Sequence, residues 1–290
     1  MPPALKILVD VAIFRLKKLE MANVFTAAAI MIALGLEWVD MGVRFGFGLL
    51  LNLLAYLTND YFDVVQDLES PNKNHAKTAY LKDHMGAALG AQIGLAIFLA
   101  LVALAWSPGL FAPLVLGAGI CWIYSWKLKR VPYVDVLAMI AWGVAMPMVG
   151  WPLDRELGWL LVGQAALFSA CFESIQVIRD HDEDLAMGVR TTAVRLGIPA
   201  TKVLLRAFMV ISAAYAALFL HRWIGLALLA CLFLPLDPKR AAVYWTRQRF
   251  IMGVVYLALI GWIWWAGSAD GWLLGLDRGA TVDWLSRFTG

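Results

Sequence analysis

Charged residues are scarce in this sequence: Asp, Glu, Lys and Arg make up only 16% of its 290 residues, whereas apolar residues make up 62%. The apolar residues are collected in blocks close to the length of about 20 that an α-helix needs to cross a bilayer. Most blocks also lack the one-sided periodicity of a helix on the surface of a soluble protein. This composition argues against a soluble fold and predicts an all-α integral membrane protein.

Cysteine and histidine are also scarce. Cys121, Cys171 and Cys231 fall in separate apolar blocks, and the four histidines show no metal-ligand spacing. A zinc site needs several such ligands at fixed spacings, and a disulfide framework needs paired cysteines. We therefore expect packing cysteines and surface histidines rather than metal or disulfide chemistry.

Charge clusters and Pro or Gly residues divide the chain into nine predicted spans. They cover residues 21–37, 41–58, 84–106, 108–127, 133–151, 157–178, 198–219, 222–236 and 249–268. Residues 1–20 carry spaced charges and no small-residue cleavage site, which predicts an amphipathic lead-in on the membrane surface rather than a cleaved signal peptide. We expect residues 1–290 to form a single transmembrane domain.

Lys and Arg are concentrated on the side of the predicted spans that carries the N-terminus and the long polar loops. Because this excess marks the cytoplasmic side, we expect these loops to face the cytoplasm from the inner membrane. An odd number of spans then places the tail, residues 269–290, on the opposite side. There Trp272 and Trp284 either lie at the headgroup level or belong to an unstructured tail.

Two groups of acids stand where apolar runs end. If the second span continues as a helix, Asn52, Asn59, Asp63 and Asp67 share one face, with Asp60 beside them. The sixth span has a similar polar stripe, which consists of Glu173, Gln176, Asp180 and Asp184. The arrangement of residues 52–82 is thus echoed by residues 173–202, as in a duplicated membrane protein.

Carboxylates at the edge of the hydrocarbon region are costly unless they face a cavity and hold something positive. Several carboxylates close together stay ionised only around a metal ion, and an oxygen-only ligand set favours Mg²⁺. In proteins, Mg²⁺ is usually held by one or two carboxylates together with substrate phosphates. A metal site in a membrane cavity therefore predicts a prenyl diphosphate as substrate, with basic residues that grip its oxygens: Lys127, Lys129, Arg130, Arg179 and Arg190.

Simpler interpretations exist for each group. An isolated Asp-x-x-Asp at a helix end is usually a cap or a solvated pair, although two matched clusters in a chain so poor in charge argue against this. The excess of positive charge in cytoplasmic loops explains Lys127, Lys129 and Arg130 equally well. Glu173 is either a buried polar contact or part of the pocket for a second substrate.

The two acidic motifs resemble the signatures of the UbiA superfamily of intramembrane prenyltransferases. The stretch "NDYFDVVQD" is N-D-x-x-D-x-x-x-D, and "DHDEDLAMGVRTTAVRLG" is D-x-x-x-D-x-x-x-G-x-[KR]-[ST]. Between them, "YSWKLKRVP" is similar to the basic loop of the family. The resemblance extends from the first to the ninth span.

The resemblance implies nine transmembrane helices around a cavity that opens to lipid, and transfer of a prenyl group from a Mg²⁺-bound diphosphate to an acceptor that is often aromatic. It implies catalytic roles for Asp63, Asp67, Asp180 and Asp184, and it adds Asn59 and Asp60 to these four as metal ligands. The expected substrate-binding residues are Asn59, Lys127, Lys129, Arg130, Arg190, Tyr124 and Glu173. Candidate aromatic walls for an allylic cation are Tyr56, Phe62, Trp122, Tyr124, Trp142 and Phe172.

The chain departs from the family in two basic segments. After the first motif it reads "LESPNKNHAKT", with Lys73 and Lys77 as the only cations, and its lead-in "FRLKKLEMAN" lacks an arginine followed by proline. These departures leave the acceptor open among quinone precursors, chlorins, glycerol phosphate ethers, carotenoids and other aromatics. The base that deprotonates the acceptor is open among Asp67, Glu173 and Asp182.

Two alternative functions remain from the sequence. The same ionisation without an acceptor would make a membrane terpene cyclase. Duplicated halves with intramembrane acids also suit a cation-coupled transporter, although the acids cluster at the membrane edge and no span is broken in its middle. We expect the lipid bilayer, a prenyl diphosphate and a hydrophobic acceptor as partners, and no nucleic acid; prenyl length and oligomeric state are not indicated.

Overall fold

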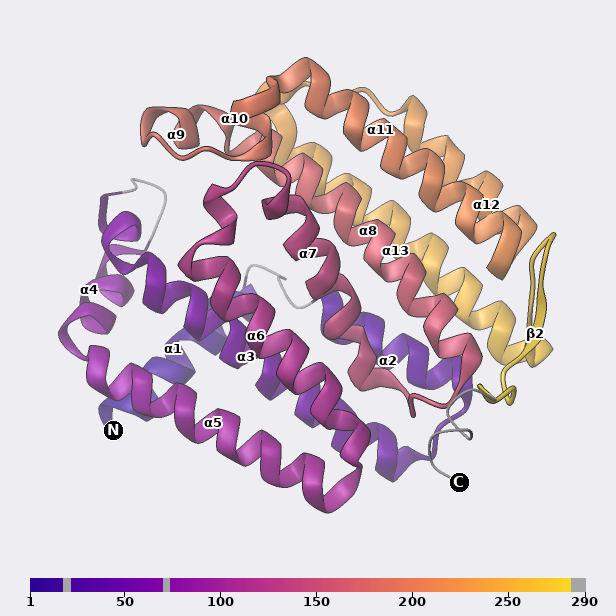
Figure 1. Ribbon diagram of the computed structural model, residues 1–290, viewed down its shortest axis with the longest axis horizontal. Helices are drawn as coiled ribbons and strands as arrows, with labels where there is room; N and C mark the ends of the chain where they lie inside the picture. Colours follow the sequence, from indigo (N-terminus) through magenta and orange to yellow (C-terminus); the bar gives the residue numbers. More distant parts are fainter. Residues whose placement is uncertain (18–21, 70–73, 283–290) are drawn as a thin grey trace.

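A computed structural model describes residues 1–17, 22–69 and 74–282 of the chain. Lys73, Trp284 and the end of the predicted lead-in lie outside these ranges. The described residues form a bundle of α-helices with one short β-hairpin (Figure 1). The helices are α1 (Pro3–Lys17), α2 (Ala22–Leu34), α3 (Trp38–Glu69), α4 (His75–Asp83), α5 (Met85–Trp106), α6 (Phe111–Trp126), α7 (Val134–Ala145), α8 (Glu156–Arg179), α9 (His181–Ala186), α10 (Thr192–Leu196), α11 (Ile198–Tyr215), α12 (Arg222–Leu229) and α13 (Ala241–Ala266).

Within the described ranges, six helices are long and apolar enough to cross a membrane. They correspond to the predicted spans that begin near residues 41, 84, 108, 157, 198 and 249. Three shorter apolar helices, Asn23–Leu34, Val134–Gly150 and Arg222–Phe233, fall in the remaining predicted spans. The all-helical membrane architecture is therefore confirmed, whereas the count of nine spans stays a prediction.

Six of the helices form a closed ring. In order around it, α2 packs on α3, α3 on α6, α6 on α7, α7 on α8, and α8 on α13, which returns to α2. Helix α5 packs outside α3 and α6, and α11 packs outside α8. Separate hydrophobic cores fill the α3–α5–α6 side and the α8–α11–α13 side, so the interior between the two sides is free to form a cavity.

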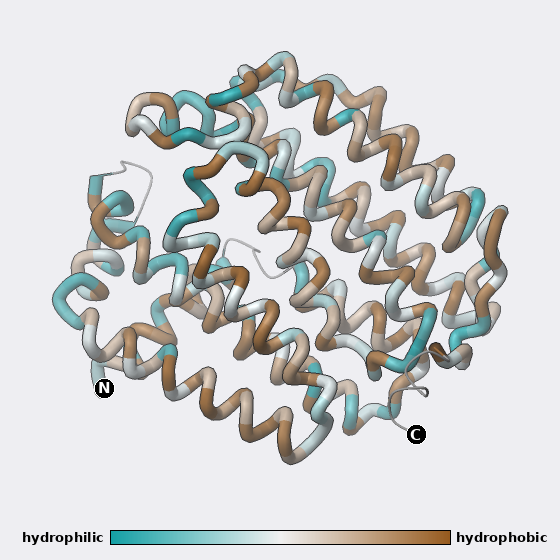
Figure 2. Tube along the Cα trace, in the orientation of Figure 1, coloured by the Kyte–Doolittle hydropathy of each residue, from teal (hydrophilic) through white to brown (hydrophobic). Residues whose placement is uncertain are grey.

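The polar segments gather at one end of the ring. Figure 1 shows α4, α9 and α10 at this end and β2 at the other, and the tube in Figure 2 is hydrophilic at this end and mostly hydrophobic along the long helices. Helix α1 packs beneath this end against α3 and α5. Short polar helices thus lie over the C-terminal ends of α3 and α8, where the two acidic motifs are located.

The C-terminal segment folds as a hairpin, which no pattern in the sequence predicts. Strands β1 (Ser268–Asp270) and β2 (Gly275–Asp277) pair antiparallel, and the N–H groups of Trp272 and Leu273 donate to the carbonyl oxygens of Ala217 and Leu218. Strands of three residues are too short for a recognisable alternation of polar and apolar residues. The described part of the tail is therefore ordered, and Trp272 remains exposed on it.

A buried arginine joins α3 to the connection between α7 and α8. The Arg44 side chain is 4% exposed, and its Nε lies 2.9 Å from both carboxylate oxygens of Asp40. Its Nη1 donates to the carbonyl oxygens of Val149 and Trp151 at 3.2 and 3.3 Å. Because the buried guanidinium serves a carboxylate and two carbonyl groups from separate segments, Arg44 is a structural requirement of this end of the bundle.

We predict that Arg44→Met lowers the free energy of unfolding by about 3 kcal/mol, because it leaves the carbonyl groups of Val149 and Trp151 without their donor and removes the cation beside Asp40, which keeps the Trp106 indole N–H at 2.7 Å. Thermal unfolding of the detergent-solubilised protein, followed by tryptophan fluorescence, measures the change. The control is Arg222→Met, since Arg222 is 48% exposed and lies 3.6 Å from Asp270; a loss of about 0.5 kcal/mol or less is expected there. Equal losses in the two variants would contradict the prediction.

Candidate active site

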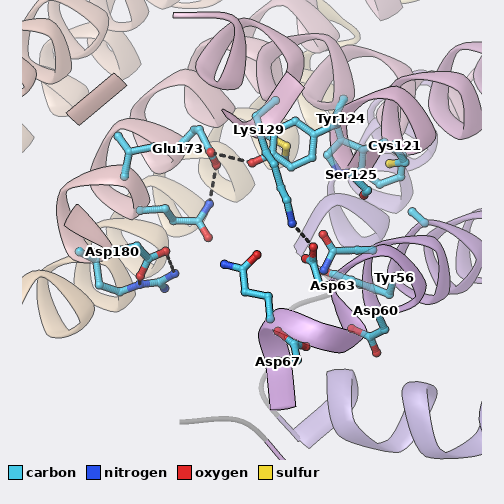
Figure 3. A pocket seen from close by; sticks show the side chains of 18 of the residues that line it. Tyr56, Asp60, Asp63, Asp67, Cys121, Tyr124, Ser125, Lys129, Glu173 and Asp180 are labelled. Atoms are coloured by element: carbon cyan, nitrogen blue, oxygen red, sulfur yellow. Dashed lines mark hydrogen bonds and ion pairs between the residues drawn. The ribbon is translucent and has the colours of Figure 1, made fainter. Parts of the chain in front are cut away.

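A cavity of about 700 Å³ lies inside the ring and reaches its polar end. One wall is the face of α3 that carries Asn52, Tyr56, Asn59, Asp63 and Asp67, residues three, four or seven positions apart. The opposite wall consists of α8 and α9, from Phe172 to Asp184. Figure 3 shows Glu173 and Asp180 on one side of the cavity and Asp60, Asp63 and Asp67 on the other. Both acidic rows therefore line one chamber.

The acids of α3 are buried beside cations from other segments. Asp60 is 3% exposed, and its two carboxylate oxygens accept from Arg15 of α1 and Lys77 of α4, each at 2.5 Å. Asp63 is 8% exposed and forms an ion pair with Lys129 from the loop after α6. Helices α1 and α4 and the loop after α6 are thereby tied to the first acidic motif.

The acids of the second motif stand where α8 ends. Arg179 holds both oxygens of Asp180 at 2.6 and 2.7 Å. Asp184 lies one turn further on, and its N–H donates to the carbonyl oxygen of Asp180 at 2.9 Å. Partial burial and the neighbouring Asp180 raise the pKa of Asp184 to about 6. This carboxylate is thus poorly compensated by the protein alone and would be stabilised by an added cation.

A buried carboxylate fixes the loop that follows the second motif. Asp135, at the start of α7, is 1% exposed and accepts from the N–H of Thr192 at 2.7 Å and from its hydroxyl group. The same hydroxyl oxygen accepts from the N–H of Tyr133, whose φ of 70° is unusual for a residue other than glycine. The loop with Lys129 and the loop after Asp184 are therefore held together.

A second polar group lies deeper in the cavity. Glu173 is 5% exposed and accepts from the Tyr124 hydroxyl at 3.3 Å and from the Gln176 amide at 2.8 Å. All three side chains line the cavity. Since Glu173 stands seven residues before Asp180 on α8, it lies about 10 Å further into the bundle, given the rise of a helix.

The family assignment follows from comparison with known proteins. The UbiA prenyltransferase family model matches residues 22–249. The chain belongs to this family. The fold agrees as well. The chain resembles a solved digeranylgeranylglyceryl phosphate synthase structure with a TM-score of 0.65 at 15% identity, over 90% of this chain and 98% of that one.

A UbiA homologue from Archaeoglobus fulgidus, solved with bound GPP and Mg²⁺, also matches with a TM-score of 0.61 at 15% identity, over 84% of this chain and 96% of that one. Identities this low show the fold alone.

In sequence, the chain is 26% identical to the digeranylgeranylglyceryl phosphate synthase of Thermococcus kodakarensis over 185 residues, a region that covers 62% of this chain and 64% of the relative. It is 27% identical over 135 residues to the 4-hydroxybenzoate octaprenyltransferase of Chromohalobacter salexigens, 42% and 43% of the two chains. The matched region spans less than two thirds of both relatives.

The predicted site residues of this UbiA family member separate into two groups. The cavity is lined by the larger group, which consists of Asn59, Asp60, Asp63, Asp67, Tyr124, Lys129, Glu173, Asp180 and Asp184. Lys127, Arg130 and Arg190 are exposed and are absent from the lining; their contact with a substrate stays a prediction. Among the aromatic candidates, Phe62 and Trp122 are absent from the lining and meet edge to face, with ring centroids 5.7 Å apart.

Some lining residues were not predicted from the sequence. Arg15 is one of them, since the sequence places it only in the amphipathic lead-in. Asp135 is absent from the lining, but its role in holding the neighbouring loop was not predicted either, because it falls in an apolar span. Trp245 and Arg249 of α13 also line the cavity, with the Arg249 guanidinium 4.1 Å from the centre of the Trp245 ring. An acid in the first turn of an otherwise apolar helix was the one local signal for Asp135, whereas Arg15 and Arg249 resemble any basic residue near a membrane surface.

The described residues contain no group of three or more His, Cys, Asp or Glu side chains that could hold a metal ion by itself. The donor set nevertheless fits a hard divalent cation, because carboxylate and amide oxygens from α3 face carboxylates from α8 and α9 across one cavity. Mg²⁺ normally keeps several waters and takes further ligands from substrate phosphates. The residues therefore fit a metal that binds together with a diphosphate.

The raised pKa of Asp184 predicts the pH dependence of the metal-free protein. Between a pH of about 4, where an exposed Asp titrates, and about 6 the folded state binds more protons than the unfolded state. Stability therefore falls as the pH rises through this window. In EDTA, we expect the melting temperature of the wild type to fall from pH 4 to pH 6 relative to Asp184→Asn, which does not titrate. Parallel curves for the two proteins would contradict the assignment.

Proposed function

We propose that this protein transfers a prenyl group from a prenyl diphosphate to an acceptor within the membrane, releases diphosphate, and depends on Mg²⁺. The observation that carries this proposal is the single cavity lined by both acidic rows, with lysine and arginine side chains among them. A diphosphate needs both kinds of group, since metal ions bridge its oxygens and cations neutralise its remaining charge. The family and the GPP and Mg²⁺ bound to the Archaeoglobus homologue support the same function.

Asn59, Asp63 and Asp67 of α3 and Asp180 and Asp184 opposite are the residues that would hold Mg²⁺. Bound there, Mg²⁺ would supply charge neutralisation for the departing diphosphate. Asp60 is less available than the other acids, because its two oxygens accept from buried cations of two other helices, whereas Asp180 pairs with the adjacent and more exposed Arg179. The proposed main role of Asp60 is therefore to anchor α1 and α4 over the cavity mouth.

The reaction breaks the allylic C–O bond, and the electron pair leaves with the diphosphate. Lys129, Lys77 and Arg179 line the cavity beside the acids and would bind the diphosphate oxygens. Tyr56, Trp142 and Phe172 line the same cavity and would stabilise positive charge on the prenyl group. The acceptor then forms a bond to the prenyl carbon and gives up a proton.

Two of the three candidate bases for this proton line the cavity, namely Asp67 and Glu173. The third, Asp182, has a side chain that is 97% exposed and bonded to His181. We therefore assign deprotonation to the cavity acids and no chemical role to Asp182. The acidic end is assigned to the cytoplasmic side of the inner membrane, because the basic loops lie at this end.

We predict that Asp63→Asn and Asp180→Asn each lower the rate of diphosphate release by about 100-fold or more, because each removes a carboxylate that binds the metal. The measurement uses purified protein in lipid nanodiscs with geranyl or geranylgeranyl diphosphate and an acceptor such as 4-hydroxybenzoate or a geranylgeranyl glycerol phosphate ether, and follows diphosphate release with and without Mg²⁺. Asp182→Asn is the matched control in the same motif and should keep near-wild-type activity. Near-normal turnover of either cavity variant would count against the proposed function.

Lys129 and Lys127 provide a second matched pair, since they are two residues apart but only Lys129 lines the cavity. Lys129→Met should raise the KM for the prenyl diphosphate by about tenfold, because it removes one charge-assisted contact to the leaving group. Lys127→Met should change it by less than about twofold. Steady-state kinetics with varied donor distinguishes them, and equal effects would show that the loop contributes only general positive charge.

A further inference from the structure

One amide nitrogen in the cavity wall has no hydrogen-bond acceptor among the described residues. The side chain of Asn52, on α3, is 2% exposed and lines the cavity, and its Nδ2 donates to no group in the described part of the chain. Asn52 stands seven residues before Asn59 and is therefore about 10 Å deeper in the bundle than the first metal-motif residue.

The other buried side-chain amides behave differently. The amide nitrogens of Gln92, Gln164 and Gln248 all donate, respectively to the Ala88 carbonyl, the Ser212 hydroxyl, and the Cys231 carbonyl and Tyr244 hydroxyl groups. None of these three glutamines lines the cavity. Buried polar groups are almost always paired in native proteins, so an exception calls for a specific reason. The amide oxygens of Gln164 and Gln248 also accept from no described group, but of these four side chains only Asn52 has an amide nitrogen without an acceptor, and only Asn52 lines the cavity.

Asn52 and Glu173 occupy matching positions on the two walls. Asn52 stands seven residues before Asn59, the first residue of the motif on α3. Glu173 stands seven residues before Asp180, the first residue of the motif that follows α8. Both are buried and both line the cavity. The cavity thus has one polar residue on each side at a similar depth below its acidic end.

The tail of a prenyl diphosphate cannot pair with either residue, since it is a hydrocarbon with no hydrogen-bonding atom. The diphosphate oxygens belong with the acids and cations at the polar end, about 10 Å away along the helix axis. A polar group at this depth is useful only to a second ligand that carries an oxygen or nitrogen atom. In binding sites, a few polar groups of this kind fix the orientation of an otherwise apolar ligand.

We propose that the Asn52 amide donates a hydrogen bond to an oxygen atom of the acceptor, across the cavity from Glu173, and so selects an oxygen-bearing acceptor. The torsion that turns an asparagine amide is broad, so the amide can turn toward a ligand while α3 stays in place. Asn52 is a specificity-determining residue of this site. The inference rests on the proposed prenyl transfer and argues against a cyclase, which would leave this amide unpaired in every state.

The test compares Asn52→Leu, which replaces the amide by an apolar group of similar shape, with the wild type in nanodiscs. The donor is geranylgeranyl diphosphate, and the acceptors are 4-hydroxybenzoate, a naphthoquinol and a geranylgeranyl glycerol phosphate ether. Diphosphate release and prenylated product are both measured. With the preferred acceptor, Asn52→Leu should raise the acceptor KM about tenfold or more, as expected when a buried hydrogen bond to substrate is lost, while the donor KM changes by less than about twofold.

Gln92→Met is the matched control, because it removes a buried amide from the neighbouring helix α5 outside the cavity. Its acceptor KM should equal that of the wild type. Asn52→Leu should melt no lower than the wild type, because it removes an unpaired buried group; Asn52→Ala repeats the kinetic test if leucine does not fit. A loss of acceptor affinity in a protein of full stability is a result that a purely structural role of Asn52 would not produce.

Three outcomes would overturn the inference. The acceptor KM of the Asn52 variants stays within twofold of wild type, or the donor and acceptor KM values rise together, or the wild type releases diphosphate and makes a hydrocarbon while prenylating none of the oxygen-bearing acceptors. Failure of the proposed function itself looks different. In that case the wild type shows no Mg²⁺-dependent release of diphosphate at all.

Discussion

Carboxylates buried near the hydrocarbon region need a cation or a hydrogen-bond donor beside them, because little water is present to solvate their charge. Asp60 meets this need by lying between Arg15 and Lys77, and Asp63 meets it through Lys129. None of the three cations belongs to the helix that carries the acids. Neutralising the first acidic motif therefore brings the N-terminal helix, α4 and the loop after α6 over the polar end of the cavity.

The same pairing prepares the cavity for the proposed substrate. A diphosphate with bound metal ions brings negative and positive charges into the cavity. The cavity already contains carboxylates that can bind the metal ions and cations that can bind the diphosphate. Metal ions at Asp63 and Asp180 would take the places of Lys129 and Arg179, whose positive charges would then be available to the diphosphate oxygens. This exchange replaces one partner of each carboxylate by another, and it requires no opening of the ring of packed helices.

The local part of the site was predictable. An apolar run with acids three or four residues apart gives a helix with one polar edge, because helical geometry alone places those residues on one face. The cavity lining accordingly contains both predicted acidic rows. The roles of neighbouring loop residues were not predictable, as Lys127 and Lys129 show. A 3₁₀ turn at Leu128–Arg130 determines which of the two lysines lies beside the acids. No periodic pattern in the sequence marks this turn. The C-terminal hairpin was missed because its strands are too short to carry a pattern.

The amino-acid pattern alone was sufficient for what depends on neighbours along the chain: apolar blocks of membrane length, polar helix edges, and the two motifs that identify the family. Contacts between distant segments were decided by packing. Three features depend on which helices lie side by side: the ion pair of Arg15 with Asp60, the hydrogen bonds between Asp135 and Thr192, and the lack of an acceptor for the Asn52 amide nitrogen within the described residues. Each is a property of two or more segments at once, and hydrogen bonds and ion pairs form only where packing brings the atoms to within about 3 Å.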